Sequence, residues 1–261
     1  MTPTIHIHSQ IMDLSVPKIM GIMNATPDSF AVHCSALDRS ALLPYVQTLV
    51  EEGADMIDIG ACSTRPGSKM VDLEEEWKRM SAALMVVKSA YPQMPISIDT
   101  VRAEIVRRAH DEFGIDMVND VSGLADEDML PLLQRIGVPY ILTHPRDEDM
   151  LSFFSYQLDR LHRAGVADVI IDPGLCFGKT LSQNYTILRE MNQLQLLECP
   201  IMIGLSRKSM IYNVLGVTAQ EALNGTTAAH MAALKAGANI LRVHDVSEAK
   251  QTVQIYKTIY G

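Results

Sequence analysis

Polar residues that could bind ligands or catalyse a reaction recur at the ends of short apolar runs throughout the 261-residue chain. The residues in these positions are Asn24, Asp58, Asp99, Asn119, His144, Asp172, Ser206-Arg207-Lys208, Arg242 and His244. A lone Asp or Asn after a strand usually caps a helix or forms a turn. Such a residue after nearly every run favours one shared site, because buried polar groups need partners.

These polar residues and one loop arginine fall into two chemical classes. Asp99, Asn119 and Asp172 carry short acceptor groups that suit the donor edge of a fused heterocycle. The cationic donors are Arg65, Arg207, Lys208, Arg242 and His244. In a chain with 22 Lys and Arg against 31 Asp and Glu, net charge −9, such a cluster predicts an anionic ligand, phosphate or pyrophosphate. The acidic balance also argues against nucleic acid as a partner.

Eight apolar runs are predicted to be strands, and each is followed by a helical pattern. The strands are Lys18–Met23, Met56–Gly60, Ile96–Asp99, Asp116–Asn119, Tyr140–Thr143, Val169–Asp172, Ile201–Gly204 and Ile240–Val243. The helices are Ser40–Glu52, Leu73–Ala90, Arg102–Phe113, Asp128–Ile136, Asp149–Ala164, Leu181–Gln195, Ala219–Ala236 and Ser247–Tyr260.

This alternation predicts an α/β fold, with a single (β/α)8 TIM barrel over residues 17–261. A doubly wound sheet is disfavoured because no G-x-G-x-x-G turn occurs. Reactive groups in such barrels lie at the C-terminal ends of the strands, where the polar residues above are found. Residues 1–16 alternate apolar and polar side chains, which predicts an N-terminal hairpin that closes the other end of the barrel.

The sequence gives no sign of membrane insertion or secretion. Its apolar runs are far shorter than the roughly 20 residues that span a bilayer. The start of the chain has neither a basic region nor an apolar region of a secretory signal. The four cysteines form no C-x-x-C pair, which disfavours a disulfide framework or a zinc site. We therefore expect a cytoplasmic protein with no membrane partner.

Ordered motifs occur between Gly21 and Asp245. They are GIMNATPDSF (21–30), GADMIDIG (53–60), STRPG (63–67), IDT (98–100), NDVSG (119–123), DPGLCFGKT (172–180), SRKS (206–209) and RVHD (242–245). With these motifs the chain resembles the dihydropteroate synthase family, the folate-pathway transferases that sulfonamides target. The resemblance implies condensation of 6-hydroxymethyl-7,8-dihydropterin pyrophosphate with p-aminobenzoate, giving 7,8-dihydropteroate and pyrophosphate, on a barrel that forms homodimers.

The resemblance also implies a role for each matching residue. The pterin-binding set is Asp99, Asn119, Asp172 and Lys208. Asn24 is implied as the Mg²⁺ ligand, and Arg65, Arg242 and His244 as the pyrophosphate contacts. The residues expected around p-aminobenzoate are Phe30, Thr64, Pro66, Phe177, Lys208 and Ser209. Asp99, Lys208 and Arg242 are the expected catalytic residues.

The chain departs from the family pattern in a few places. Cys176 stands where the family has glycine, and Ala31-Val32-His33-Cys34 replaces the usual Ser-Asp-Gly-Gly. Two other functions are therefore considered. A pterin-binding methyltransferase domain would share the acceptor residues, but it would not need Thr64-Arg65-Pro66 or Ser206-Arg207-Lys208. A degenerate pterin-binding subunit would bind the ligand without turnover, and it would release no pyrophosphate.

Overall fold

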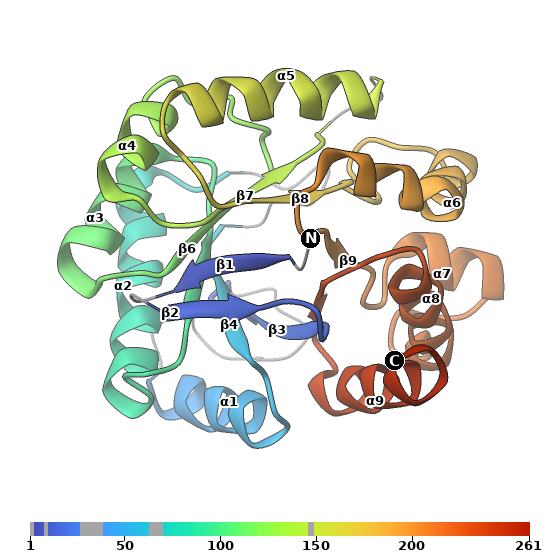
Figure 1. Ribbon diagram of the computed structural model, residues 1–261. Coiled ribbons are helices and arrows are strands. Elements are labelled where there is room, and N and C mark those ends of the chain that lie inside the picture. The colour runs from blue at the N-terminus through green and yellow to red at the C-terminus, as the bar shows by residue number, and fades with distance from the viewer. Residues whose placement is uncertain (1–2, 8–9, 27–38, 63–69, 146–148) are drawn as a thin grey trace.

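The computed structural model describes residues 3–7, 10–26, 39–62, 70–145 and 149–261. Eight parallel strands form one sheet in the order β8-β7-β6-β5-β4-β3-β10-β9. They are β3 (Lys18–Asn24), β4 (Met56–Gly60), β5 (Ile96–Asp99), β6 (Met117–Asp120), β7 (Tyr140–Thr143), β8 (Val169–Asp172), β9 (Met202–Gly204) and β10 (Ile240–Val243). A parallel bridge between Ile171 and Ile201 brings the two edge strands together. The predicted (β/α)8 barrel is confirmed (Figure 1).

The helices surround the sheet in the order expected from the sequence. They are α1 (Arg39–Glu51), α2 (Leu73–Ala90), α3 (Ala103–Phe113), α4 (Met129–Ile136), α5 (Met150–Arg163), α6 (Leu181–Glu190), α7 (Ser209–Leu215), α8 (Leu223–Lys235) and α9 (Val246–Tyr260). Within the described ranges, no helix is long and apolar enough to cross a membrane.

The structure differs from the predicted helices in two places. The helix predicted at Leu181–Gln195 divides into α6 and a 3₁₀ segment, η1 (Met191–Leu197). The sequence pattern did not reveal α7, because seven residues make only about two turns and show too little periodicity. This short helix begins directly after the SRKS motif, so its first turn fixes the position of Lys208.

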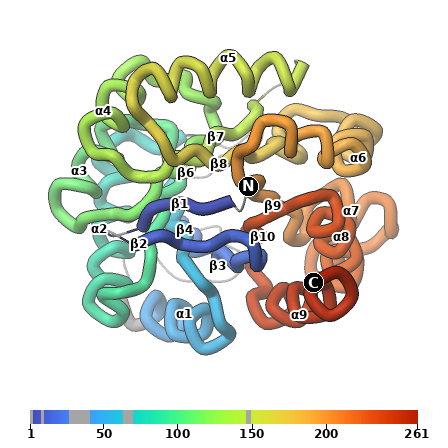
Figure 2. The backbone as a smooth tube through the Cα atoms, viewed as in Figure 1, coloured from blue at the N-terminus to red at the C-terminus, as the bar shows by residue number. Residues whose placement is uncertain are grey.

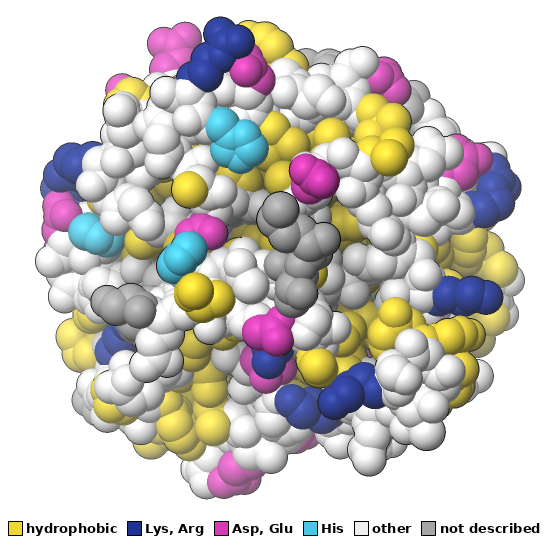
Figure 3. Space-filling model, viewed as in Figure 1, with side chains coloured by type: hydrophobic (Ala, Val, Ile, Leu, Met, Phe, Trp, Pro, Cys, Tyr) yellow, Lys and Arg dark blue, Asp and Glu magenta, His cyan; other side chains and the backbone are white. Residues whose placement is uncertain are grey.

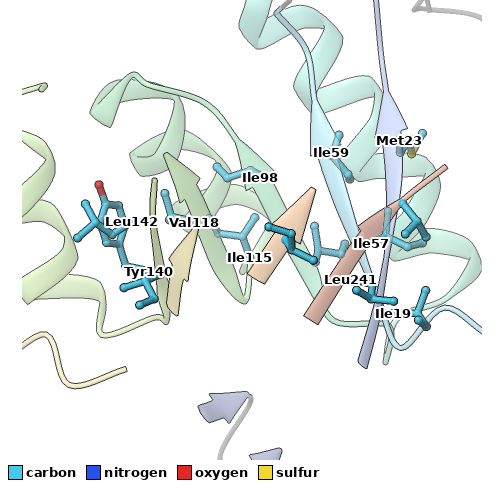
Figure 4. Close-up of a cluster of buried hydrophobic side chains, with 14 of the residues drawn as sticks. Ile19, Met23, Ile57, Ile59, Ile98, Ile115, Val118, Tyr140, Leu142 and Leu241 are labelled. Carbon is cyan, nitrogen blue, oxygen red and sulfur yellow. The ribbon is translucent and has the colours of Figure 1, made fainter. Parts of the chain in front are cut away.

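Most apolar side chains of the strands pack outward against the helices. Side chains alternate along a strand, so Ile57 and Ile59 face the helices while Asp58 between them faces the barrel interior. Figure 4 shows this outward layer, which includes Ile19, Ile98 and Leu241. Burying an aliphatic side chain of this size contributes about 1.5–3 kcal/mol, which makes the layer the main source of stability.

A second apolar cluster fills the N-terminal end of the barrel interior. Its members come from the strands and from the N-terminal hairpin, and they are Ile5, Ile7, Leu14, Met20, Met56, Met117, Ile141, Ile170, Met202 and Ile240. The hairpin pairs β1 (Thr4–Ile7) with β2 (Gln10–Asp13) in antiparallel register. Figures 1 and 2 show it lying across this end of the barrel. Access to the interior is therefore from the C-terminal ends of the strands.

The face around the hairpin carries both acidic and basic side chains. Figure 3 shows them interspersed among apolar and uncharged groups, with no broad basic patch among the described residues drawn on that face. This agrees with the net charge of −9. The polar residues of interest lie at the opposite end.

Candidate active site

The polar side chains that end the strands gather at the C-terminal end of the barrel. They are Asn24 on β3, Asp58 on β4, Asp99 on β5, Asn119 on β6, Asp172 on β8 and Arg242 on β10. Strand register places Gly60 beside Asp99, and Asp99 beside Asn119. A Cβ added to Gly60 would lie 3.5 Å from Asn24 Oδ1 and 3.7 Å from Asp99 Oδ2. Glycine at this position therefore leaves space between two polar groups.

Arg242 lies at the centre of this group. Its Nε donates to Asp58 Oδ2 at 2.6 Å, and its Nη2 donates to Asp99 Oδ2 at 2.7 Å. Asn119 Nδ2 donates to the same Asp58 oxygen at 3.0 Å. Within the described chain, Asp99 Oδ1 and Asn119 Oδ1 are buried without a hydrogen-bond partner. Buried acceptors of this kind are costly, so they indicate a place where a ligand supplies the donors.

The carboxylates of this network outnumber its single guanidinium. Burial raises the pKa of Asp99 to about 7, and the negative charge of Asp58 adds to the effect while Arg242 opposes it. Burial disfavours the charged form of Arg242, but Asp58 and Asp99 outweigh it and raise the pKa of the guanidinium. Arg242 is therefore always charged, whereas Asp99 changes its protonation near neutral pH.

Lys208, in the loop after β9, and Asp172, at the end of β8, are a second set of oppositely charged groups at the barrel mouth. Burial lowers the pKa of Lys208 and raises that of Asp172, and the opposite charge of each partner limits the other's shift. Lys208 Nζ donates to the Leu175 carbonyl at 2.5 Å and lies 4.8 Å from the ring centroid of Phe177. The lysine is thus held over an aromatic face, beside a carboxylate.

The turn between β8 and α6 fixes the position of Phe177. Gly174 has φ +67°, and a Cβ there would lie 2.1 Å from the His144 carbonyl oxygen, so only glycine fits. Lys179 Nζ donates to the carbonyls of His144 and Gly174 at 3.0 and 2.9 Å and closes the turn. Cys176 also has a left-handed φ of +67°, a conformation that costs a non-glycine residue about 1–2 kcal/mol.

Arg207 does not join the cationic donors at the site as expected. Its guanidinium binds the carboxylate of Asp245 through Nε and Nη2 at 2.9 and 2.8 Å, and it also donates to the carbonyl of Ala219. These bonds link the loop after β9 to the start of α9, and they occupy the guanidinium of Arg207. The sequence pattern grouped Arg207 with the ligand contacts because it could not show that Asp245 would capture it.

The remaining predicted site residues are only partly described. Asn24 and His244 are half-buried at the ends of β3 and β10, and the His244 N–H donates to Ser206 Oγ at 3.2 Å. Ser209 Oγ lies 3.7 Å from Cys176 Sγ, beside Phe177. The other predicted residues, Phe30, Thr64, Arg65 and Pro66, lie outside the described residues.

Asp58 is the central residue to which the sequence analysis gave no role, although it listed Asp58 among the polar residues that end the strands. It is fully buried and contacts both Arg242 and Asn119. The signal was present, because an acidic residue in the apolar run Met-Ile-Asp-Ile-Gly needs a buried partner. Its partner could not be identified, since Arg242 is far away in the sequence.

Comparisons with known proteins show the family to which the chain belongs. The family model described as "Pterin binding enzyme" matches residues 20–244. The dihydropteroate synthase of Escherichia coli K12 is 34% identical over 264 residues, which cover 94% of this chain and 92% of that protein. The chain belongs to the dihydropteroate synthase family.

Solved structures of other family members have the same fold. A dihydropteroate synthase from Clostridium difficile, determined in the presence of pteroic acid, is 35% identical with a TM-score of 0.88, and the match covers 94% of this chain and 97% of that one. The Yersinia pestis enzyme in complex with a sulfonamide drug is 32% identical with a TM-score of 0.90, and 98% of each chain is covered.

Proposed function

We propose that this chain condenses 6-hydroxymethyl-7,8-dihydropterin pyrophosphate with p-aminobenzoate, giving 7,8-dihydropteroate and pyrophosphate. The observation that carries the proposal is the Asp99–Arg242–Asp58–Asn119 network, which presents buried acceptors and one guanidinium at the barrel mouth. The relatives and solved structures described above carry the same activity name.

The pterin pocket consists of Asp99, Asn119, Asp172 and Lys208. A dihydropterin ring offers an amino group and ring N–H groups as donors, together with a carbonyl oxygen as acceptor. The oxygens of Asp99 and Asn119 that have no partner among the described residues match the donors, and the buried Asp172 would accept a further one. Lys208 supplies the complementary donor. This division of donors and acceptors gives selectivity, because an analogue lacking one group leaves a buried partner unpaired.

The pyrophosphate of the substrate is assigned to Arg242 and His244 at the end of β10, with Arg65 as a third contact. Arg242 stays charged at all relevant pH values and offers a planar set of donors that fits phosphate oxygens. Its bonds to Asp58 and Asp99 orient the guanidinium before the substrate arrives. Such preorganised charge is the main way a site stabilises a departing anion.

Asn24 is the chain's proposed ligand for Mg²⁺. It supplies a carboxamide oxygen at the end of β3, next to the space that Gly60 leaves open. Hard oxygen ligands suit Mg²⁺, which commonly uses one or two protein ligands together with substrate phosphates and water. When bound, the ion would neutralise charge on the pyrophosphate oxygens.

The chemistry needs an anion to leave and a neutral amine to attack. The C–O bond between the pterin methylene and pyrophosphate breaks, the aniline nitrogen forms the new C–N bond, and it then loses a proton. Arg242 and His244 hold the leaving anion, while ionised Asp99 and Asp172 favour the positive charge that develops on the pterin. Catalysis therefore depends on charge placement by Asp99, Lys208 and Arg242 and requires no strong base.

The p-aminobenzoate slot is assigned to Phe177, Lys208 and Ser209, together with Phe30, Thr64 and Pro66. The Phe177 ring provides an apolar wall, and Lys208 lies over its face. Ser209, at the start of α7, adds a hydroxyl group beside them. A benzene ring with an anionic carboxylate matches this combination of an aromatic wall and a cation.

The homodimer is proposed to form through the outer face of α6, α7 and α8. This face has an apolar cavity of about 430 Å³ whose lining includes Tyr185, Leu188, Ile211, Val214 and Leu215. Val214 and Leu215 are 56% and 51% exposed in the single chain. Adjacent exposed aliphatic side chains around an apolar hollow are typical of a protein interface. The cytoplasmic location expected from the sequence stays a prediction.

The proposed function is tested by assaying the purified chain with the pterin pyrophosphate, p-aminobenzoate and Mg²⁺. We expect dihydropteroate and pyrophosphate in equal amounts, with loss of both on addition of EDTA and recovery with excess Mg²⁺. Pterin binding without pyrophosphate release at any Mg²⁺ concentration would identify a binding subunit and contradict the enzyme.

A further inference from the structure

Asp58 lies below the ring of proposed ligand contacts. It pairs in register with Ser97 on β5, whereas Gly60, two residues further along β4, pairs with Asp99. Asp58 is completely buried, while Asp99 is 7% exposed. A ligand at the barrel mouth therefore meets Asp99 before it could reach Asp58.

One oxygen of Asp58 holds two proposed ligand contacts from different strands. Oδ2 accepts from Arg242 Nε on β10 at 2.6 Å and from Asn119 Nδ2 on β6 at 3.0 Å. The first bond fixes the plane of the guanidinium together with Asp99. The second bond uses the NH₂ group of the Asn119 carboxamide, so the carboxamide oxygen is the atom that can accept from a ligand.

We propose that Asp58 is a positioning residue for the reaction. It holds the guanidinium of Arg242 in the orientation that binds pyrophosphate, and it holds the carboxamide of Asn119 with its oxygen toward the pterin. Asp58 itself touches neither part of the substrate. This inference rests on the proposed function, because both partners are assigned there as substrate contacts.

A neighbouring carboxylate shows what a buried structural aspartate looks like in this fold. Asp120 on β6 is also fully buried, and it accepts from Ser122 N at 2.8 Å, Leu124 N at 3.1 Å and Tyr140 Oη at 2.7 Å. Both of its oxygens are engaged within its own loop and the adjacent strand. Asp58 instead leaves Oδ1 unpartnered among the described residues and uses Oδ2 to orient two side chains.

The first test compares ligand binding by Asp58→Ala and Asp58→Asn, with Asp120→Asn as the matched control. The probes are inorganic pyrophosphate for the Arg242 side and 6-hydroxymethylpterin for the Asn119 side, both measured by calorimetry. We expect Asp58→Ala to lower the affinity for both probes at least about tenfold, because a misplaced guanidinium or carboxamide loses most of its contribution to binding. Asp58→Asn should keep the pterin affinity within a few-fold, since its amide oxygen can still accept from Asn119.

Kinetics and a double-mutant cycle separate positioning from a general loss of structure. In Asp58→Ala we expect kcat/KM for the pterin substrate to fall roughly 10- to 100-fold, with an unchanged KM for p-aminobenzoate at saturating pterin. In an Asn119→Ala background, the same substitution should cost no further pterin affinity. Asp120→Asn should lower the melting temperature and leave both probe affinities unchanged.

If Asp58→Ala does not fold, a measurement on the unsubstituted protein still tests the inference. The Nε–H signal of Arg242 in a ¹H–¹⁵N spectrum, assigned with Arg242→Lys, should stay protected from exchange before and after both probes bind. Loss of this signal on binding, additive losses in the cycle, or unchanged affinities in Asp58→Ala would overturn the inference. If the unsubstituted protein binds neither probe, the proposed function fails instead.

Discussion

Arg242 Nη2 lies 2.7 Å from Asp99 Oδ2, so the proposed pyrophosphate contact and a proposed pterin contact are bonded to each other. The second Asp99 oxygen has no hydrogen-bond partner within the described residues. A pterin can therefore bind this carboxylate without displacing the arginine. In the proposed function the two halves of the substrate meet at this ion pair, so we expect binding of one half to influence binding of the other.

The first prediction concerns the pH dependence of pterin binding. The pKa of Asp99 is about 7 in the ligand-free protein, and the ring N–H groups need its ionised form. Affinity for 6-hydroxymethylpterin should be nearly constant above pH 7 and fall by up to about tenfold per pH unit below it. Calorimetry between pH 5.5 and 8.5, at about half-unit steps, measures this slope. Asp99→Asn should bind weakly with most of the slope removed, and an equal slope in both proteins would contradict the assignment.

The second prediction concerns the effect of the raised Asp99 pKa on the stability of the fold. The pKa of Asp99 lies above its ordinary value of 3.8, so the native state binds a proton more readily than the unfolded state between about pH 4 and 7. The free energy of unfolding contributed by Asp99 therefore decreases as pH rises through this window. Asp99→Asn removes that contribution, so its stability relative to the parent should be higher at pH 8 than at pH 4.5. Urea denaturation at both pH values measures the difference, and the reverse order would show that the ionised carboxylate is stabilising.

The third prediction separates the two tasks of Asp172. One of its oxygens accepts from the Gly174 N–H at 2.8 Å and supports the turn, while the carboxylate also faces the proposed pterin pocket. Asp172→Asn can keep the bond to Gly174 but presents an amide to the pterin, costing about 1–3 kcal/mol of binding free energy. Asp172→Ala should lose this binding and also some thermal stability. Unchanged pterin affinity in Asp172→Asn would remove Asp172 from the pocket.

The sequence predicted the barrel well because each strand is a short apolar run with its own turn signals. It also predicted that the polar side chains gather at one end of the barrel, since the strand ends in this fold share one mouth. It could not pair Asp58 with Arg242, or Arg207 with Asp245, because these contacts join residues that are distant in the chain. Residue type alone placed both Arg207 and Arg242 among the ligand contacts. Only the geometry shows that Arg207 is bound to Asp245 and has a structural role.

The fourth prediction tests this separation with two arginine variants. Arg242→Ala should weaken binding of the pterin pyrophosphate more than binding of the pterin alcohol, by roughly 1.5–3 kcal/mol for the lost charge-assisted contact. His244→Ala should have the same selectivity. Arg207→Ala is the control, and it should lower the melting temperature with equal, small effects on both ligands. Equal losses for both ligands in Arg242→Ala and His244→Ala would show that these side chains are structural.

The fifth prediction is that sulfonamides compete with p-aminobenzoate, and that they do so only when pyrophosphate or the pterin substrate is present. The slot proposed beside Phe177, Lys208 and Ser209 suits a benzene ring, and a sulfanilamide ring has the same width as that of p-aminobenzoate. We expect the two binding events to be cooperative, because the proposed pyrophosphate contact Arg242 and the proposed slot lie at the same barrel mouth. Inhibition kinetics at varied p-aminobenzoate, with binding measured with and without pyrophosphate, test both statements.

We expect Cys176 to make this competition depend on the size of the drug. Its left-handed backbone suits glycine, and its Sγ lies 3.7 Å from Ser209 Oγ at the edge of the slot. Cys176→Gly should therefore stabilise the protein by up to about 1 kcal/mol, once the larger entropy that glycine loses on folding is subtracted from the relieved strain. It should also improve inhibition by bulky substituted sulfonamides more than by sulfanilamide. Sulfanilamide serves as the control, because its ring should not reach the thiol. Noncompetitive inhibition, equally tight binding without pyrophosphate, or equal gains for large and small drugs in Cys176→Gly would show that the slot lies elsewhere.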